Sequence, residues 1–328
     1  MILCNVKNME QNNGVKRRRV ALVLAGGGAR GVAHIGAIEE LERRGYEIGA
    51  VAGTSMGALV GGMYASGHLE EFKEWMCALD RYRVFSLVDF TFSTEGLVKG
   101  SRVIEAMKEL IPDMRIEQMR IPFTAVSADL LSGSEVVIER GGLYDAIRAS
   151  IAIPSVFRPV HRDGMVLTDG GIVNPLPLNR VRRCAGDLLV GVDVCAPFAG
   201  AGSAAADAEA SEAAAGDTRE GLWHGAGRRA RSIGAAVGKL PSLNYYKLIT
   251  AATEIMTQHL TRLMCRLYEP DMLFELPADR FGLFEFYRAQ EIVEAGAEAA
   301  RRVLDRWEAG ADARGDEDSV QRDEGLRL

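Results

Sequence analysis

The apolar residues in the first part of the chain follow two periods in turn. A continuous apolar run at 20–24 leads through three glycines into residues 31–45, where apolar side chains recur at helical spacing. The order then repeats, with an apolar run at 48–52 and a second helical segment at 56–65. Continuous apolar runs of this length are typical of strands buried on both faces, and helices between them supply the crossovers. The pattern predicts an α/β fold with a mainly parallel sheet.

The rest of the chain continues the same two periods. Short apolar runs predict strands at 122–130, 134–140, 165–171, 186–194 and 272–277. Apolar residues at helical spacing predict helices at 143–150, 243–267 and 288–307. The first two of these strands flank a Ser-Gly turn, which predicts a hairpin.

Composition divides the chain into one folded unit and three polar segments. Residues 1–18 are predicted to be a disordered leader, and 309–328 a charged, disordered tail. A low-complexity insertion at about 199–235 is dominated by small and acidic residues, so it buries too little apolar area to offset the entropy of ordering. Because no boundary divides the remainder, 19–308 is predicted to be a single domain.

Charge and hydropathy exclude several classes of protein. The 328 residues carry a net charge of -6, which provides no general attraction to nucleic acid. No apolar run reaches the roughly 18 residues that a membrane-spanning helix needs, and the N-terminus lacks the apolar core of a signal peptide. The chain is therefore expected in the cytoplasm. A basic run at 16–19 leaves two interpretations open, peripheral contact with an anionic membrane or a solvated leader, and nothing indicates the oligomeric state.

A candidate nucleophile, Ser55, stands in the segment GTSMG between the second predicted strand and the helix that follows it. A sharp strand-to-helix turn lifts a serine hydroxyl clear of the backbone, and the small residues Gly53 and Gly57 relieve the crowding in such a turn. A structural glycine turn has the same pattern, but the order of strand, turn and helix favours the nucleophile.

A glycine-rich segment, AGGGARG at 25–31, joins the first strand to the first helix. Consecutive glycines here expose backbone N–H groups beside the positive end of a helix, as an acyl-transfer enzyme needs for a developing oxyanion. The alternative is a dinucleotide fingerprint, since Gly26, Gly28 and Gly31 fit G-x-G-x-x-G. That motif needs an acidic residue at the end of the second strand, where this chain has its serine turn, so nucleotide binding is disfavoured.

The base that activates Ser55 is predicted to be an aspartate. Ser55, Asp169 and His259 follow the chain order of the α/β-hydrolase triad, but His259 falls inside a predicted helix, whereas that fold places its histidine on a loop. Asp169 ends a predicted strand and is followed by Gly170 and Gly171, and strand ends carry the sites of open α/β sheets. An Asp-Gly turn explains the same residues, yet a carboxylate beside the serine permits a Ser-Asp dyad.

Three motifs thus stand in one order: GGGARG with the flanking VAHIGAIEEL, then GTSMG, then DGG more than a hundred residues later. In this order and context the chain resembles the patatin-like phospholipase family, lipid acyl hydrolases that include the neuropathy target esterase-type domains. The resemblance is dense over about 20–195, looser over 240–305, and absent from the leader, the insertion and the tail.

The resemblance implies a three-layer α/β/α fold around a mainly parallel sheet, with Ser55 as nucleophile and Asp169 as base. The serine attacks a fatty-acyl ester while the aspartate takes its proton, and water then cleaves the acyl-enzyme. No cofactor is implied. The cysteines form no C-x-x-C pair and no carboxylates cluster near the motifs, so no metal site is predicted.

The resemblance also assigns roles within the glycine-rich segment. Gly26, Gly27 and Gly28 are expected to supply the amides of an oxyanion hole. Arg30 and Gly31 belong to the same motif, in which the guanidinium of Arg30 is expected to steady a phosphate or the glycine loop. A surface salt bridge is the alternative for this arginine.

The implied substrate is a lipid or another fatty-acyl ester, and the sequence says little about which one. Residues 82–100 concentrate aromatic side chains, which are interpreted either as an acyl-binding wall or lid or as ordinary core. On the first interpretation, replacing Phe90 or Phe92 by Ala alters chain-length preference. Two other functions stay open: an acyltransferase that passes the acyl group to an alcohol, and a catalytically weak regulatory or adaptor protein of the same fold.

Overall fold

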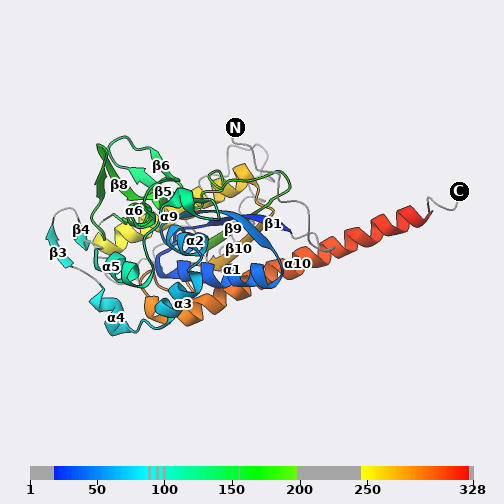
Figure 1. Cartoon of the computed structure of the whole chain (residues 1–328), viewed down its shortest axis with the longest axis horizontal. Helices are drawn as coiled ribbons and strands as arrows, with labels where there is room; N and C mark the ends of the chain where they lie inside the picture. The colour runs from blue at the N-terminus through cyan, green and yellow to red at the C-terminus, as the bar shows by residue number, and fades with distance from the viewer. Residues whose placement is uncertain are drawn as a thin grey trace, which may run out of the picture.

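The computed structural model describes residues 18–87, 90–93, 96–98, 101–154, 156–197 and 245–324. Within these ranges an eight-stranded sheet has the order β10-β9-β1-β2-β5-β8-β7, with β6 paired to β5 (Figure 1). The parallel strands are β1 (Arg19–Leu24), β2 (Glu47–Thr54), β5 (Phe123–Asp129), β9 (Leu188–Ala196) and β10 (Met272–Pro277). Antiparallel pairing adds β6 (Glu135–Ile138), β7 (Val160–Arg162) and β8 (Met165–Asp169), and a separate ribbon joins β3 (Phe90–Ser93) to β4 (Gly96–Val98).

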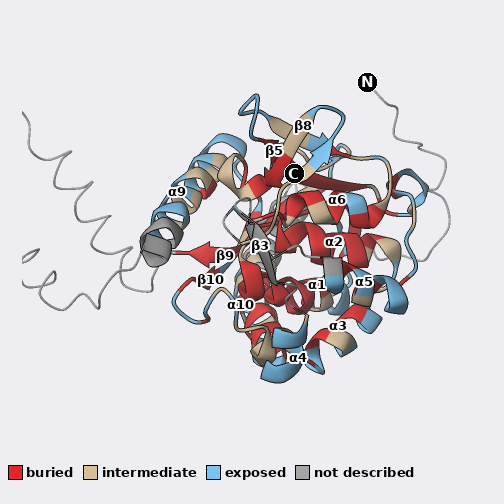
Figure 2. Ribbon diagram, turned by 90° about the vertical axis from the view of Figure 1, so that its left-hand side faces the viewer, coloured by how far each residue is buried: buried red, intermediate tan, exposed pale blue. Residues whose placement is uncertain are grey.

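Alternate residues of β1 enter two different cores, one on each face of the sheet. Leu22 and Leu24 join the larger core, whereas Ala21 and Val23 join a smaller one, which is covered by α9 (Tyr245–Tyr268). The larger core is covered by α1 (Ala33–Arg43), α2 (Met56–Ser66), α6 (Leu143–Ser150) and α10 (Ala289–Glu324). Figure 2 shows the buried strands between these helices and α9. The predicted three-layer α/β/α architecture is therefore confirmed.

Three short helices between α2 and β5 are absent from the sequence prediction: α3 (Leu69–Cys77), α4 (Arg81–Ser86) and α5 (Ser101–Leu110). Helices of this length are marginal on their own and depend on tertiary packing, so their periodic signal is weak.

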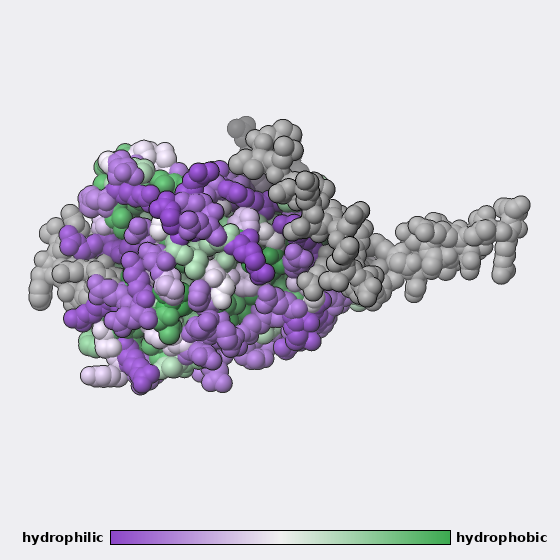
Figure 3. All heavy atoms as spheres, viewed as in Figure 1, coloured by the Kyte–Doolittle hydropathy of each residue, from purple (hydrophilic) through white to green (hydrophobic). Residues whose placement is uncertain are grey.

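On the face shown in Figure 3, hydrophilic side chains dominate and hydrophobic ones form scattered patches, as on most globular proteins. No helix in the described ranges combines the length and hydrophobicity needed to span a membrane, and the cytoplasmic location stays a prediction.

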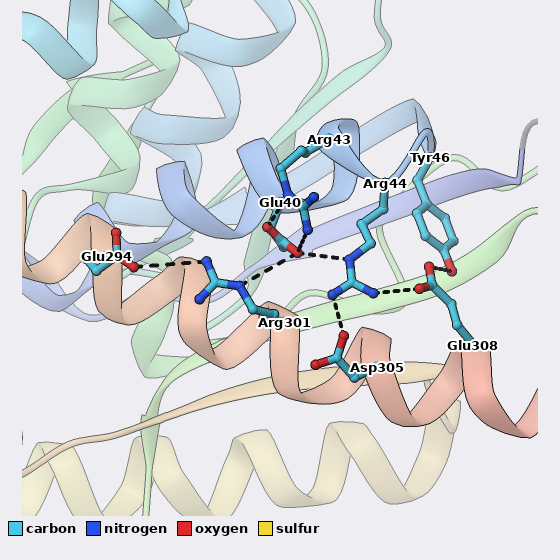
Figure 4. A network of polar contacts seen from close by, with 8 residues as sticks. All are labelled: Glu40, Arg43, Arg44, Tyr46, Glu294, Arg301, Asp305 and Glu308. Atoms are coloured by element: carbon cyan, nitrogen blue, oxygen red, sulfur yellow. Dashed lines mark hydrogen bonds and ion pairs between the residues drawn. The ribbon is translucent and has the colours of Figure 1, made fainter.

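A network of charged residues clamps α10 to α1 (Figure 4). Arg43 and Arg44 both donate hydrogen bonds to the buried carboxylate of Glu40, and they hold the pKa of that carboxyl down to about 2. Arg44 also donates to Glu308 at 2.6 Å and pairs with Asp305, both on α10. The contacts join the beginning of the fold to its last helix.

Helix α10 continues to Glu324, beyond the end predicted for it, so residues 309–324 are helical where a disordered tail was predicted for 309–328. The physical reason is that extending an established helix fixes one residue for each hydrogen bond, whereas starting a new one is costly. The leader and the insertion at 199–235 fall outside the described residues apart from Arg18. The division of the chain into one domain and three polar segments stays a prediction.

Candidate active site

Ser55 stands at the junction of β2 and α2, with φ of 55° and ψ of -123°. Positive φ is uncommon for a residue with a side chain, and close packing holds the serine there. A Cβ on Gly53 would lie 2.3 Å from the carbonyl oxygen of Gly57, and a Cβ on Gly57 would lie 2.2 Å from that of Leu24. Both positions therefore require glycine.

Asp169 lies beside the serine hydroxyl. Ser55 Oγ donates a hydrogen bond to Asp169 Oδ2 at 2.5 Å, and the N–H of Gly171 donates to Asp169 Oδ1 at 2.8 Å. Ser55 and Asp169 are both buried. Burial raises the pKa of Asp169 to about 6, although the hydrogen bonds from Ser55 and Gly171 favour the ionised form. A carboxyl group with this pKa is suited to accept a proton near neutral pH.

The chain brings Asp169 to the serine by an antiparallel strand of the predicted, mainly parallel sheet. Strand β5 continues beyond Val126, the last residue paired with β2, and β8 runs back along this extension. Strand β8 ends where Asp169 pairs with Ser127. Val126 pairs with Thr54, so the next residues of the two strands, Ser127 and Ser55, are also neighbours. The carboxylate of Asp169, opposite Ser127, therefore lies close to Ser55.

A second serine, Ser150 at the end of α6, supports the turn. The N–H of Ser55 donates to Ser150 Oγ at 2.8 Å, and that hydroxyl donates to the carbonyl oxygen of Val126 at 2.6 Å. A Cβ on Gly170 would lie 2.4 Å from the same carbonyl oxygen, which explains the first glycine of DGG. Sequence analysis missed Ser150, because nothing in a helix-ending serine indicates a partner 95 residues away.

The glycine loop passes close to the serine. A Cβ on Gly26 would lie 3.3 Å from Ser55 Cβ, but the N–H of Gly26 donates to the carbonyl oxygen of Pro175 at 3.0 Å. This amide is therefore engaged within the protein, which removes it from the predicted set of oxyanion donors. The N–H groups of Gly27 and Gly28 have no acceptor among the described residues, so they remain the predicted donors.

Arg30 is buried, and the alternative of a surface salt bridge is wrong. Its Nε donates to the carbonyl oxygen of Gly27 at 3.3 Å, and its Nη1 donates to that of Ala278 at 2.9 Å. Nη1 also donates to Glu254 Oε1 of α9 at 2.6 Å. The guanidinium thus contacts the glycine loop, while its predicted roles in steadying this loop or a phosphate stay predictions. The neighbouring Gly31 packs against the first residue of α2.

No histidine in the described part of the chain forms a hydrogen bond with Ser55 or Asp169. His34 is fully buried, with Nε2 2.8 Å from the carbonyl oxygen of Ala25, and burial lowers its pKa to about 4, so it is neutral. His259 lies on the exposed side of α9. These positions leave the carboxylate as the partner of the serine.

Two cavities meet at Ser55. The first, of about 370 Å³, is bounded by the glycine loop, Asp169, α9 and residues 278–283, and it contains the charged side chains Arg30 and Glu254. The second, of about 330 Å³, is lined by apolar side chains except at Gly28 and Ser55, which belong to both cavities. The described residues contain no group of three or more His, Cys, Asp or Glu arranged to hold a metal ion.

Part of the wall of the apolar cavity comes from the three short helices, for example from Met76, Val84 and Val103. Leu79 and Leu87, which follow α3 and α4, also line it. The segment 82–100, predicted as an acyl-binding wall or core, thus contributes Val84 and Leu87 to a cavity. Its aromatic residues behave differently: Tyr82 and Phe85 are exposed, and the side chains of Phe90 and Phe92 lie outside the described part of the structure.

Sequence comparisons relate the chain to a known family. The family model of the patatin-like phospholipases matches residues 22–181. An uncharacterized NTE family protein of Mycobacterium tuberculosis (strain H37Rv) is 34% identical over 336 residues, which cover 90% of this chain and 93% of the relative. Lysophospholipase NTE1 of Mycosarcoma maydis is 30% identical over 306 residues, which cover 88% of this chain and 15% of that protein. The crystal structure of VipD from Legionella pneumophila gives a TM-score of 0.44 at 14% identity, covering 89% of this chain and 67% of that one.

A mixed, mostly parallel sheet with a serine on a strand-to-helix turn and a buried carboxylate beside it defines a class of α/β protein. Within that class, the chain belongs to the patatin-like phospholipase family and is related to its NTE-type members along nearly its whole length.

Proposed function

We propose that this protein is a serine lipid acyl hydrolase of the phospholipase A, lysophospholipase or esterase type, acting through Ser55 and Asp169. The observation that carries the proposal is the 2.5 Å hydrogen bond between Ser55 Oγ and Asp169 Oδ2, formed where an apolar cavity meets a charged one. Membership of the patatin-like phospholipase family supports a lipid substrate, and a relative named as a lysophospholipase supports a phospholipid or lysophospholipid.

In the proposed first step, Ser55 Oγ attacks the ester carbonyl carbon while Asp169 takes the hydroxyl proton. When the tetrahedral intermediate collapses, the carbon–oxygen bond to the leaving alcohol breaks and the protonated Asp169 returns its proton to that oxygen. In the second step a water molecule loses a proton to Asp169 and attacks the acyl-enzyme. Collapse then releases the fatty acid and restores the serine hydroxyl.

The oxyanion of each intermediate needs preorganised donors. The N–H groups of Gly27 and Gly28 are suited to this role because neither has an acceptor among the described residues. The N–H of Met56, at the start of α2, also has no recorded acceptor there, and a helix N-terminus favours negative charge. The sequence analysis did not include Met56 among the donors.

The two cavities suggest how an ester is oriented. A fatty-acyl chain is favoured in the apolar cavity, because its transfer there removes methylene groups from water. The alcohol part of the ester then occupies the cavity that contains Arg30 and Glu254. In this orientation the scissile carbonyl lies at Ser55 and Gly28, which line both cavities together with Ile153, Val156 and Leu283.

Covalent labelling with a fluorophosphonate probe tests the site. Labelling is expected for the wild type, to be lost in Ser55→Ala, to fall strongly in Asp169→Asn and to persist in His259→Ala. Labelling that survives Ser55→Ala contradicts the nucleophile. Loss in His259→Ala with full labelling of Asp169→Asn contradicts the dyad.

Product analysis separates the functions that remain open. Free fatty acid released from phospholipid, lysophospholipid or triglyceride supports the hydrolase. Transfer of the acyl group to an added alcohol in preference to water supports the acyltransferase. Labelling without turnover of any of these esters supports the regulatory or adaptor protein.

A further inference from the structure

The leaving-group cavity, which is the first cavity described above, carries charges of both signs. Of its lining residues, Arg30 provides a cation, and Glu254 and Asp169 provide carboxylates. Glu254 comes from α9, on the opposite face of the sheet from α1 and α2, and the sequence gives no reason to place it in the site. Its carboxylate oxygen Oε1 lies 2.6 Å from Arg30 Nη1.

The ion pair holds the guanidinium in a fixed position. Arg30 is 5% exposed, and its Nε and Nη1 are held by the carbonyl oxygens of Gly27 and Ala278 as well as by Glu254. Within the described residues, Nη2 donates no hydrogen bond. A ligand oxygen that approached this nitrogen would find a donor whose charge is already balanced by a neighbouring carboxylate.

Glu254 keeps access to the cavity. Its side chain is 32% exposed, and Thr253 and Thr257 of the same helix also line the cavity. A further carboxyl, that of Asp193, is buried near Arg30, and burial raises its pKa to about 6. Arg30 is thus the one cation among the lining residues, which include two carboxylates, and it also interacts electrostatically with a third acidic group, Asp193.

We propose that Glu254 is a specificity-determining residue that makes this cavity disfavour esters whose leaving group carries a net negative charge. The inference rests on the proposed function. An anionic head group placed near Arg30 also meets the carboxylate of Glu254, and like charges at short range in a partly dehydrated site are costly. A zwitterionic head group avoids this cost, because its phosphate faces the guanidinium while its cationic amine faces Glu254.

The test compares three lysolipids with the same acyl chain: zwitterionic lysophosphatidylcholine, anionic lysophosphatidylglycerol and neutral monoacylglycerol. Each is presented in the same uncharged detergent micelle, so that surface charge is constant. The wild type is expected to prefer the zwitterionic ester to the anionic one in kcat/KM. Glu254→Gln is expected to raise the rate on the anionic ester, relative to the neutral one, by about tenfold.

Two variants serve as controls. Glu254→Asp keeps the charge and is expected to retain the wild-type order of substrates. Glu294→Gln removes an exposed carboxylate of α10 that does not line the cavity, and it is expected to leave rates and ratios unchanged.

The outcomes separate this inference from the proposed function. Wild-type rates that are equal on the zwitterionic and anionic esters overturn the inference without any variant. It is also overturned if Glu254→Gln lowers all three rates by one common factor, since Glu254 then acts as a brace for Arg30. Failure of the wild type to release fatty acid from any ester overturns the proposed function itself.

Discussion

In the proposed mechanism one buried carboxyl, that of Asp169, sets the pH at which Ser55 reacts. Asp169 must be ionised to take the serine proton, and burial raises its pKa to about 6. Because the group is protonated below that pH, kcat/KM on an uncharged ester is expected to fall about tenfold per pH unit below about pH 6 and to level off near pH 7. A profile from about pH 4.5 to 8 measures this value in the free enzyme. A rate that stays constant down to pH 5 contradicts Asp169 as the base.

Ser150 is expected to act by positioning the nucleophile. Ser150→Ala removes the acceptor of the Ser55 N–H and the donor to Val126, so two buried backbone groups each lose a hydrogen bond. The free energy of unfolding is expected to fall by about 1–3 kcal/mol, and kcat by roughly 10- to 100-fold. Denaturant titration and kinetics with a chromogenic ester measure the two effects.

A matched control is Ser66→Ala, which removes a hydroxyl bonded to a carbonyl oxygen at the end of α2, away from the cavities. It is expected to keep full activity. If Ser150→Ala loses stability but retains the wild-type kcat in the folded fraction, its role is structural and the positioning argument fails.

At the scale of elements, α3, α4 and α5 contribute part of the wall of the apolar cavity, so their side chains are expected to influence the accepted chain length. Val103 of α5 is half-buried and lines this cavity. Val103→Phe narrows it, and kcat/KM for long-chain esters is expected to fall about tenfold relative to short-chain esters. Leu131→Phe, at an exposed position outside both cavities, is the control. An unchanged ratio across a series of acyl chain lengths contradicts the assignment of this cavity to the acyl chain.

The elements differ in how far the sequence predicts them. Strands β1, β2, β5, β9 and β10 and helices α1, α2, α6 and α9 appear close to the predicted ranges, because long apolar runs and helical periods are local signals. The direction of β8 was not predictable in this way. It is set by antiparallel pairing of β8 with the last residues of β5, which are distant in sequence from Asp169. The three short helices were missed for the same kind of reason, because their stability comes from tertiary packing.

At the scale of the whole molecule, the contacts between α1 and α10 fasten the C-terminal helix to the sheet. Arg44 contacts carboxylates on both helices, and Arg44→Ala leaves Glu40 with Arg43 as its main partner. The free energy of unfolding is expected to fall by about 1–2 kcal/mol at neutral pH, with activity per folded molecule unchanged. Arg302→Ala, on the exposed side of α10, controls for loss of a surface charge.

The pH dependence gives this prediction a sign. The pKa of Glu40 is lowered from 4.5 to about 2, so its stabilising contribution is complete above about pH 4.5 and is lost as the pH falls towards 2. The difference in unfolding free energy between the wild type and Arg44→Ala is therefore expected to shrink over that window. A difference that is the same at pH 3 and pH 7 contradicts an ionic origin.

The sequence by itself determined the α/β layering, the serine turn and the aspartate as its most favoured partner. These depend on near neighbours: apolar periods decide which residues are buried, and glycines decide where the backbone can turn or approach closely. Three contacts were decided by the tertiary structure alone. The N–H of Gly26 donates to the carbonyl oxygen of Pro175, and Ser150 accepts a hydrogen bond from the N–H of Ser55. Glu254 pairs with Arg30, which lies 224 positions away in the sequence. Such pairings arise when separate elements pack together, and no local pattern encodes them.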